Sequence, residues 1–153
     1  MGPVELRPPD LSPWRGNTGV DYVTTLEGAR PGPHLMVTAL VHGNELCGAL
    51  ALEWLLRQGF RPRRGRLTLA FANVAAFRNF HPRAPLASRL VDEDFNRLWS
   101  SSVLDGAGVS VERRRARELR PLVERADCLL DLHSMQQPSP PLALAGATRK
   151  GVA

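Results

Sequence analysis

The sequence lacks the features that mark membrane-spanning and secreted proteins. No run of about 18 apolar residues could cross a bilayer, and the N-terminal residues lack the apolar stretch of a signal peptide. Only two cysteines are present, Cys47 and Cys128, and they lie far apart in the sequence. We therefore expect a soluble, cytoplasmic protein that does not act at a membrane and whose cysteines are buried thiols rather than a disulfide.

Lysine is almost absent, which affects how the positive charge is interpreted. The formal net charge is +5, yet Lys150 is the only lysine, so nearly all basic residues are arginines. They are densest at residues 61–66, in a predicted connector, and at residues 113–117, on a predicted helix whose other face is apolar. We interpret both clusters as solvated surface. Since no aromatic residues are interleaved with them, we do not expect a nucleic-acid partner.

Length and hydrophobic pattern indicate a single α/β domain. The chain has 153 residues, enough for one ordinary core. Residues 1–15 are proline-rich without periodicity and are predicted to form an extended arm, so the domain occupies residues 16–153. Apolar runs predict strands at residues 21–26, 35–41, 67–71 and 126–132, a candidate fifth strand at 142–145, and helices at 45–58 and 111–125. Such alternation favours a layered sheet with parallel pairs.

Polar side chains follow three of the predicted strands. His42 and Glu45 stand at a junction between a strand and a helix, where a spacing of three residues lets both side chains reach one ion. His133, at the end of a distant strand, would complete a His, Glu, His site with an open position for water. Asp131 would orient the imidazole of His133. Asn73 ends a third strand, and the carboxyl ends of parallel strands are where ligands gather.

A second polar cluster lies in the aperiodic segment 73–102. Arg89, Asn96 and Arg97 offer a planar fork and an amide that suit a carboxylate. A helix cap, or a local ion pair between Arg97 and Asp94, is the plainer explanation, and taken alone it is the more common one. The other two histidines stand beside prolines and fit surface or turn positions; they are His34 and His81.

Three motifs occur in a fixed order: HGNE at residues 42–45, DFNR at 94–97 and DLHS at 131–134. This order resembles the succinylglutamate desuccinylase/aspartoacylase family, a relative of the zinc carboxypeptidases, over about residues 16–146. The resemblance implies a three-layer α/β/α sandwich with a mixed, mostly parallel sheet. It also implies an enzyme that removes the acyl group from small N-acyl amino acids.

The same resemblance assigns roles to individual residues. One zinc ion would be bound by His42, Glu45 and His133. The substrate carboxylate would be held by Asn96 and Arg97, and the scissile carbonyl would be polarised by Arg89. Zinc-activated water then needs a general base, which in the family is a glutamate beyond the third zinc ligand.

No acidic residue follows His133 in this sequence. We therefore expect a truncated catalytic domain that is incomplete at its C-terminal side and inactive or incomplete as an enzyme. Missing strands would expose a sheet edge that invites association, including homo-oligomers. Two alternatives stay open at this point: a metallocarboxypeptidase-like peptidase, and a non-enzymatic fragment that binds a partner through its arginines.

Overall fold

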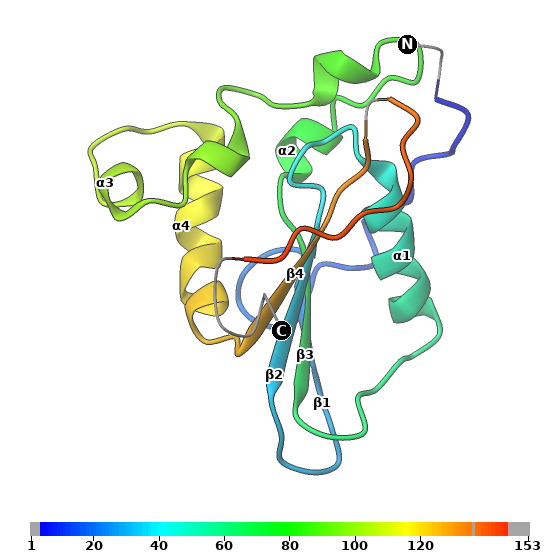
Figure 1. Ribbon diagram of the computed structural model, residues 1–153, viewed down its shortest axis with the longest axis vertical. Helices are drawn as coiled ribbons and strands as arrows, with labels where there is room; N and C mark the ends of the chain where they lie inside the picture. Colours follow the sequence, from blue (N-terminus) through cyan, green and yellow to red (C-terminus); the bar gives the residue numbers. More distant parts are fainter. Residues whose placement is uncertain (1–3, 136, 147–153) are drawn as a thin grey trace.

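The computed structural model describes residues 4–135 and 137–146, and four strands form its single open sheet (Figure 1). They are β1 (Val23–Glu27), β2 (His34–Ala39), β3 (Arg66–Phe71) and β4 (Cys128–Leu132), in the spatial order β1-β3-β2-β4. β2 pairs in parallel with both β3 and β4, whereas β1 pairs antiparallel with β3. The predicted α/β class with a mixed, mostly parallel sheet is therefore confirmed.

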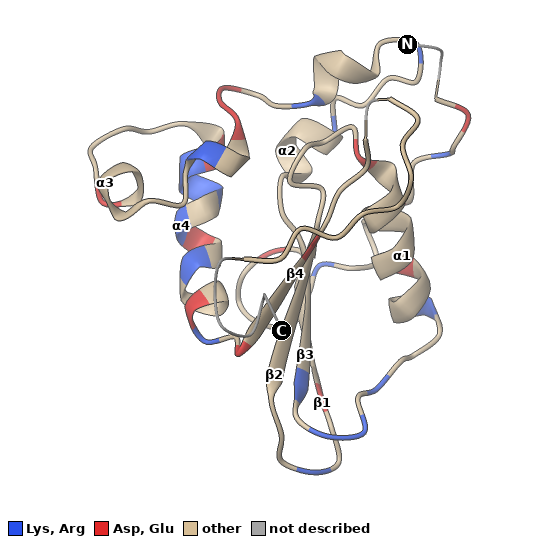
Figure 2. Cartoon of the chain, in the orientation of Figure 1, with Lys and Arg blue, Asp and Glu red and all other residues tan. Residues whose placement is uncertain are grey.

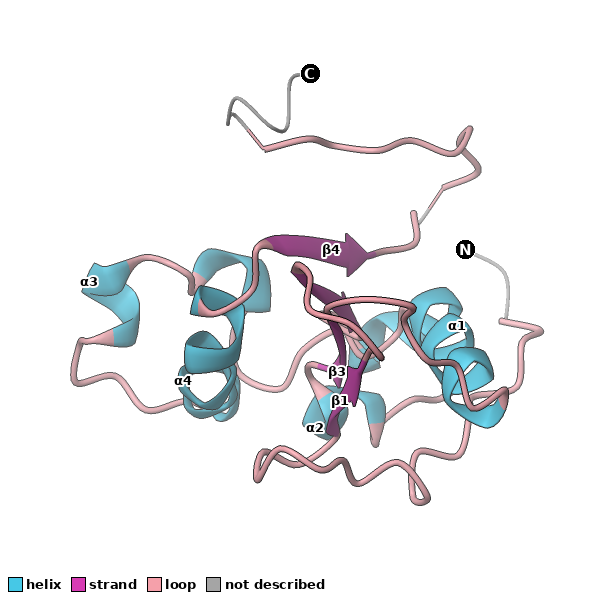
Figure 3. Cartoon of the chain, turned by 90° about the horizontal axis from the view of Figure 1, so that it is seen from below, coloured by secondary structure: helices cyan, strands magenta, loops and turns pink. Residues whose placement is uncertain are grey.

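Helices lie on both faces of this sheet (Figure 3). Helix α1 (Leu46–Arg57) packs on one face, where its apolar side chains join those of Val37 and Leu69. Helix α4 (Val111–Glu124) packs on the opposite face, against Met36 and Ala70. Neighbouring strand residues thus enter different cores, because successive side chains of a strand point to opposite faces.

The segment between β3 and α4 is ordered by short helices rather than by long ones. These are α2 (Val74–Phe77), two 3-10 helices at Pro85–Ser88 and Phe95–Arg97, and α3 (Ser101–Leu104). Phe95 and Leu98 are almost fully buried in the core under α4. These two side chains anchor the segment, which is aperiodic in sequence, to the core.

The arginines of α4, whose positions are blue in Figure 2, do more than cover a solvated surface. Arg115 donates hydrogen bonds to the backbone carbonyls of Phe71 and Ala72, at the end of β3. Arg117 donates to the carbonyls of Leu104 and Gly106. The interpretation of this cluster as solvated surface is therefore wrong for these two side chains, which satisfy backbone acceptors of neighbouring elements.

Three further expectations are corrected by the structure. Cys47 and Cys128 are free thiols but exposed: Cys47 Sγ lies 3.5 Å from the backbone carbonyl of His133, just beyond β4, and Cys128 lies on β4 itself, at the edge of the sheet. Residues 142–145 form no strand, since no neighbouring strand offers hydrogen bonds to them within the described chain. His34 is buried rather than superficial: its Nε2 lies 2.7 Å from Oγ1 of Thr68.

The N-terminal arm has neither helix nor strand between residues 4 and 15, although Leu11 is buried in the core beneath α1. In the described part of the chain, no helix is both long and apolar enough to cross a membrane.

β4 forms one edge of the sheet. Within the described residues no strand pairs with its outer side, and both of its faces carry exposed leucines: Leu129 is 47% exposed and Leu130 is 50% exposed. The opposite edge strand, β1, instead buries Val23 and Leu26. An unpaired apolar strand of this kind is a surface to which another strand can add.

Candidate metal centre

The turn between β2 and α1 carries the first two site residues. β2 ends at Ala39, and Leu40, fully buried, adopts a left-handed φ of 59° that turns the chain away from the strand direction. The backbone of Gly43 then lies very close to that of two other segments: a Cβ added to Gly43 would lie 2.4 Å from the backbone of Ala76 and Ser88. Only glycine fits there, so the HGNE turn is held firmly against its neighbours.

Glu45 lies between the two histidines and contacts both. Its Oε1 lies 2.8 Å from Nδ1 of His42, and its Oε2 lies 2.8 Å from Nδ1 of His133. Each residue offers one ligand atom such that all three atoms lie within 4.8 Å of one another. The structure therefore brings together the three predicted ligands, although they come from a buried turn and from the end of β4.

The outer nitrogens of both rings face other carboxylates. His133 Nε2 lies 2.7 Å from Oδ2 of Asp131, whose Oδ1 accepts a 2.6 Å hydrogen bond from Thr38 Oγ1 on β2. His42 Nε2 lies 3.3 Å from Oδ1 of Asp94. Both Nδ1 atoms consequently face the shared carboxylate, and both Nε2 atoms are backed by an aspartate.

Strong local fields shift the pKa values of these groups. Asp131 and then Glu45 raise the pKa of His133 from its usual 6.5 to about 10. Burial alone would raise the pKa of Glu45, yet contacts with His133 and His42 outweigh it and lower that pKa. The pKa of Asp94 is also lowered, against its burial, chiefly by the backbone N–H of Asn96 and by His42. The lowered pKa values favour the carboxylate forms of Glu45 and Asp94.

Arg89 reaches the centre from the segment before the 3-10 helix Phe95–Arg97. Its Nη2 donates a 2.9 Å hydrogen bond to Nε2 of His42 and a 3.3 Å bond to Oδ2 of Asp94. Its Nη1 lies 3.8 Å from Oε1 of Glu45. The backbone carbonyl of Arg89 also accepts a hydrogen bond from Gly43 N. The Arg89 segment and the HGNE turn therefore form one connected unit.

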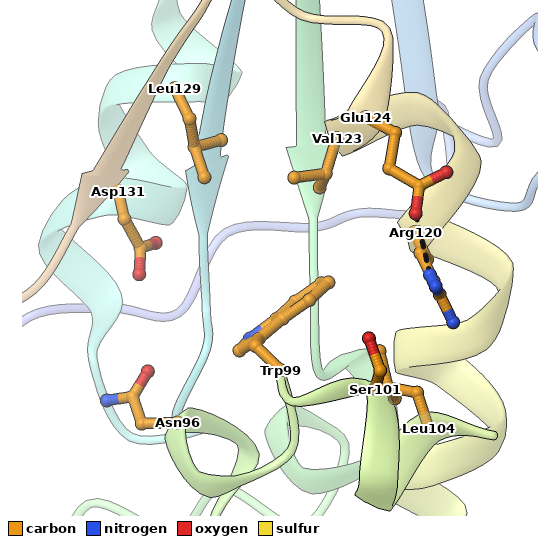
Figure 4. Close-up of a pocket in the computed structure, with 9 residues that line it drawn as sticks. All are labelled: Asn96, Trp99, Ser101, Leu104, Arg120, Val123, Glu124, Leu129 and Asp131. Carbon is orange, nitrogen blue, oxygen red and sulfur yellow. Dashed lines mark hydrogen bonds and ion pairs between the residues drawn. The ribbon is translucent and has the colours of Figure 1, made fainter. Parts of the chain in front are cut away.

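Asn96 and Arg97 lie on that 3-10 helix and are exposed. Asn96 stands at one end of a cleft of about 400 Å³, opposite Asp131 of β4, with Trp99 in the middle and Arg120 and Glu124 at the far end (Figure 4). Asp94 makes no recorded ion pair with Arg97 among the described residues; its ion pairs are with His42 and Arg89. Of the two plainer explanations of the DFNR motif, the structure shows the helix cap: Asp94 Oδ1 accepts a 2.9 Å hydrogen bond from the backbone N–H of Asn96, at the start of the 3-10 helix.

One contact between distant parts of the chain was not foreseen from the sequence. Asn73 does not reach the metal ligands; its side-chain amide donates a 3.1 Å hydrogen bond to Oε1 of Glu112, a buried residue of α4. Glu112 lies four residues before the buried Ala116 and seven before the buried Leu119. An acidic residue in register with an apolar stripe is the signal that predicts a buried, paired carboxylate.

The three side chains fit a zinc ion. Two imidazoles and one carboxylate form a donor set that zinc prefers, and carboxylates behind the imidazoles are typical of zinc sites. Glu45 Oε2 is buried and accepts no well-aligned hydrogen bond within the described residues, although His133 Nδ1 is close. A cation between these atoms would satisfy that oxygen.

Comparison with known families identifies the relatives of this chain. The succinylglutamate desuccinylase/aspartoacylase catalytic domain matches residues 31–147, which is more than half of the sequence. The chain belongs to this family. A comparison with curated proteins gave no match. The family match covers the HGNE, DFNR and DLHS motifs and therefore the complete candidate centre.

Solved structures of the family share the fold. An aspartoacylase family protein from Mesorhizobium loti is 26% identical with a TM-score of 0.54, covering 72% of this chain and 40% of that chain. Murine aminoacylase 3 is 30% identical with a TM-score of 0.52, covering 69% and 36%. A succinylglutamate desuccinylase/aspartoacylase from Rhodobacter sphaeroides, 24% identical with a TM-score of 0.58, covers 73% and 32% and shows the fold alone. The chain thus spans less than half the length of these relatives.

Proposed function

We propose that this chain is the zinc-binding portion of a hydrolase that removes the acyl group from small N-acyl amino acids. The convergence of His42, Glu45 and His133 within 4.8 Å carries this proposal. Membership of a family described by desuccinylases and aspartoacylases supplies the substrate class. Zinc bound there would lower the pKa of a water molecule to about 7 and polarise a carbonyl group.

The tautomer of His42 links metal binding to Arg89. A guanidinium only donates, so its hydrogen bond to Nε2 requires that Nε2 be unprotonated and that Nδ1 carry the proton toward Glu45. A cation at Nδ1 requires the opposite tautomer, with the proton on Nε2 facing Asp94. Arg89 can then no longer donate to His42, and its fork becomes available for the substrate carbonyl.

In this proposal Asn96 and Arg97 bind the carboxylate of the amino-acid part. Both side chains are exposed and follow Phe95, which is fully buried, and Asn96 lines the cleft. A guanidinium and an amide side by side match the two oxygens of a carboxylate. A binding assay tests the proposed roles of these residues without requiring turnover. Binding is therefore the activity to measure in this chain.

Calorimetric titration of N-acetylaspartate and succinylglutamate into the zinc-loaded chain tests the proposal. We expect binding that is at least about tenfold weaker in Arg97→Ala, since a charge-assisted contact contributes about 1.5–3 kcal/mol. Arg61→Ala, which removes an exposed arginine of the connector, is the matched control and should bind as the wild type does. Equal binding by both variants, or tighter binding of an unacylated dipeptide than of either acyl amino acid, would refute this function.

A further inference from the structure

Glu112 is the one fully buried acidic side chain among the described residues, with no exposed surface at all. It lies in the first turn of α4, between Val111 and Arg113, in a stretch otherwise rich in arginine. No ion pair of Glu112 is recorded, so a cationic side chain does not explain its burial in the described structure. A carboxylate at such a position must instead be stabilised by hydrogen bonds.

Backbone N–H groups supply those hydrogen bonds. Glu112 Oε1 accepts from the backbone N–H of Val91 at 2.6 Å, and Oε2 accepts from those of Asp92 at 3.1 Å and Glu93 at 3.4 Å. Asn73, at the end of β3, donates its side-chain amide to Oε1. One carboxylate thus fixes three consecutive peptide groups of the loop and ties them to the central sheet.

The fixed loop stands between the two groups that face His42. Arg89 precedes residues 91–93 by two positions and Asp94 follows them directly. Both side chains contact Nε2 of His42, Arg89 at 2.9 Å and Asp94 at 3.3 Å. A rotation of these peptide groups would therefore displace Arg89 and Asp94 together.

A second set of contacts holds the same loop from outside. Arg113 donates to Glu93, with Nε 2.7 Å from Oε1, and Asp92 Oδ2 accepts from the backbone N–H of Val111 at 2.7 Å. These groups are partly exposed. Ion pairs of that kind stabilise a protein weakly, whereas the Glu112 contacts are shielded from water.

We propose that Glu112 is a positioning residue, which holds the peptide groups of residues 91–93 so that Asp94 backs the zinc ligand His42 and Arg89 faces the substrate. The inference rests on the proposed function and adds to it a residue that contacts neither metal nor substrate. It acts through the backbone, so the identity of Val91, Asp92 and Glu93 matters less than the carboxylate beneath them.

Zinc affinity tests the inference without a catalytic assay. Glu112→Gln keeps the size of the side chain but replaces one acceptor oxygen by an NH2 donor. Some of the backbone N–H groups of residues 91–93 then face an NH2 group and lose their acceptor. We expect the zinc Kd, measured by competition with a chelator, to rise about tenfold, the effect of losing support behind a ligand. In the same variant the amides of residues 91–93 should exchange hydrogen faster.

Two control variants separate positioning from general stability. Glu93→Gln removes the partly exposed ion pair with Arg113 and leaves the Glu112 bonds in place, so its zinc Kd should stay close to the wild-type value. Leu26→Ala on β1, far along the sheet from the centre, lowers Tm through a core cavity and should also leave the Kd unchanged.

A double-mutant cycle then shows whether Asp94 transmits the effect. If it does, the added loss from Glu112→Gln shrinks when Asp94→Asn is already present, because the two changes act on one contact. Additive losses, or an unchanged Kd in Glu112→Gln, would overturn the inference while zinc binding by the wild type upholds the metal site. Should the variant fail to fold, rapid amide exchange at residues 91–93 of the wild type would overturn it equally.

Discussion

His42 and Glu45 occupy a buried turn, whereas His133 stands at the end of an edge strand, so the two halves of the metal centre are held by different means. The side chains of His42 and Glu45 are only 3% and 7% exposed, and the glycine between them packs directly on neighbouring backbone. The side chains of His133 and its partner Asp131 are each 32% exposed. One half is thus fixed by the core, and the other by a strand with an open side.

The difference in burial indicates that the fold preorganises the half formed by His42 and Glu45. The buried half lies in the turn between β2 and α1. Arg89 and Asp94 contact His42 from a loop that α4 holds in place. The exposed half is carried by the edge strand β4, which is held by its pairing with β2 and by the hydrogen bond from Thr38 to Asp131. Changes in the buried half should therefore have the larger effects on metal binding.

Replacing Glu45 should have the largest effect. Glu45→Ala removes the carboxylate that contacts Nδ1 of both histidines, so the two halves lose their common partner. We expect zinc affinity to fall by more than about 100-fold, beyond the loss caused by removing a group behind a ligand. Competition with a chromogenic chelator measures this, and an affinity within tenfold of the wild type would exclude Glu45 as a ligand.

Substitutions of Asp94 and Arg89 should have different effects on zinc affinity. Asp94→Asn weakens the acceptor for the proton on His42 Nε2, so the zinc Kd should rise about 10- to 100-fold. Arg89→Ala removes a donor that competes for the same nitrogen, so zinc affinity should be unchanged or slightly higher. Isothermal titration of zinc into the two variants checks the contrast. A fall in affinity for Arg89→Ala would contradict the tautomer argument.

The exposed half should respond to pH. The pKa of His133 in the metal-free fold is about 10, against 6.5 usually. Its contribution to stability is then fully present below pH 6.5 and is lost as the pH rises toward 10. Tm of the chelator-treated protein should fall across this window, less so in His133→Gln. Zinc-loaded protein should lack the fall, since the metal requires neutral His133; an identical fall with zinc would contradict this.

The smallest effect is expected at the open edge itself. Leu130→Lys places a charge on the exposed outer strand and should reduce self-association in sedimentation experiments. Because the side chain is half exposed, unfolding free energy should change by no more than about 0.5 kcal/mol. If the wild type self-associates and the Leu130→Lys variant sediments in the same way, β4 is not the contact surface.

Hydrophobic pattern was sufficient to predict the sheet strands and both long helices, because buried faces impose a periodicity on the sequence. It did not predict where β2 ends. The apolar run continues to Val41, but Leu40 adopts a left-handed conformation that apolar character does not reveal. The alternating residues 142–145 were predicted as a strand, yet a strand needs a neighbour, and the sequence does not say whether one is present.

The site was predictable where ligands share a motif and less so where contacts cross the fold. The spacing of His42 and Glu45 and the histidine that ends a strand indicated the ligands directly. Which ring nitrogen faces Glu45, and the contact between Asp94 and His42, depend on the packing of a loop 52 residues away. Glu112 could have been predicted from its register with Ala116 and Leu119, had the arginines around it not indicated a solvated face.

Zinc stoichiometry, compared across the two halves, tests the central claim most directly. The wild-type chain, loaded and then dialysed, should retain about one zinc ion per chain in mass spectrometry of the native protein. His42→Ala and His133→Ala should each lose it, while the buried His34→Ala, outside the centre, should retain it. A wild type that binds no zinc, or that binds it equally after loss of either ring, would contradict the account.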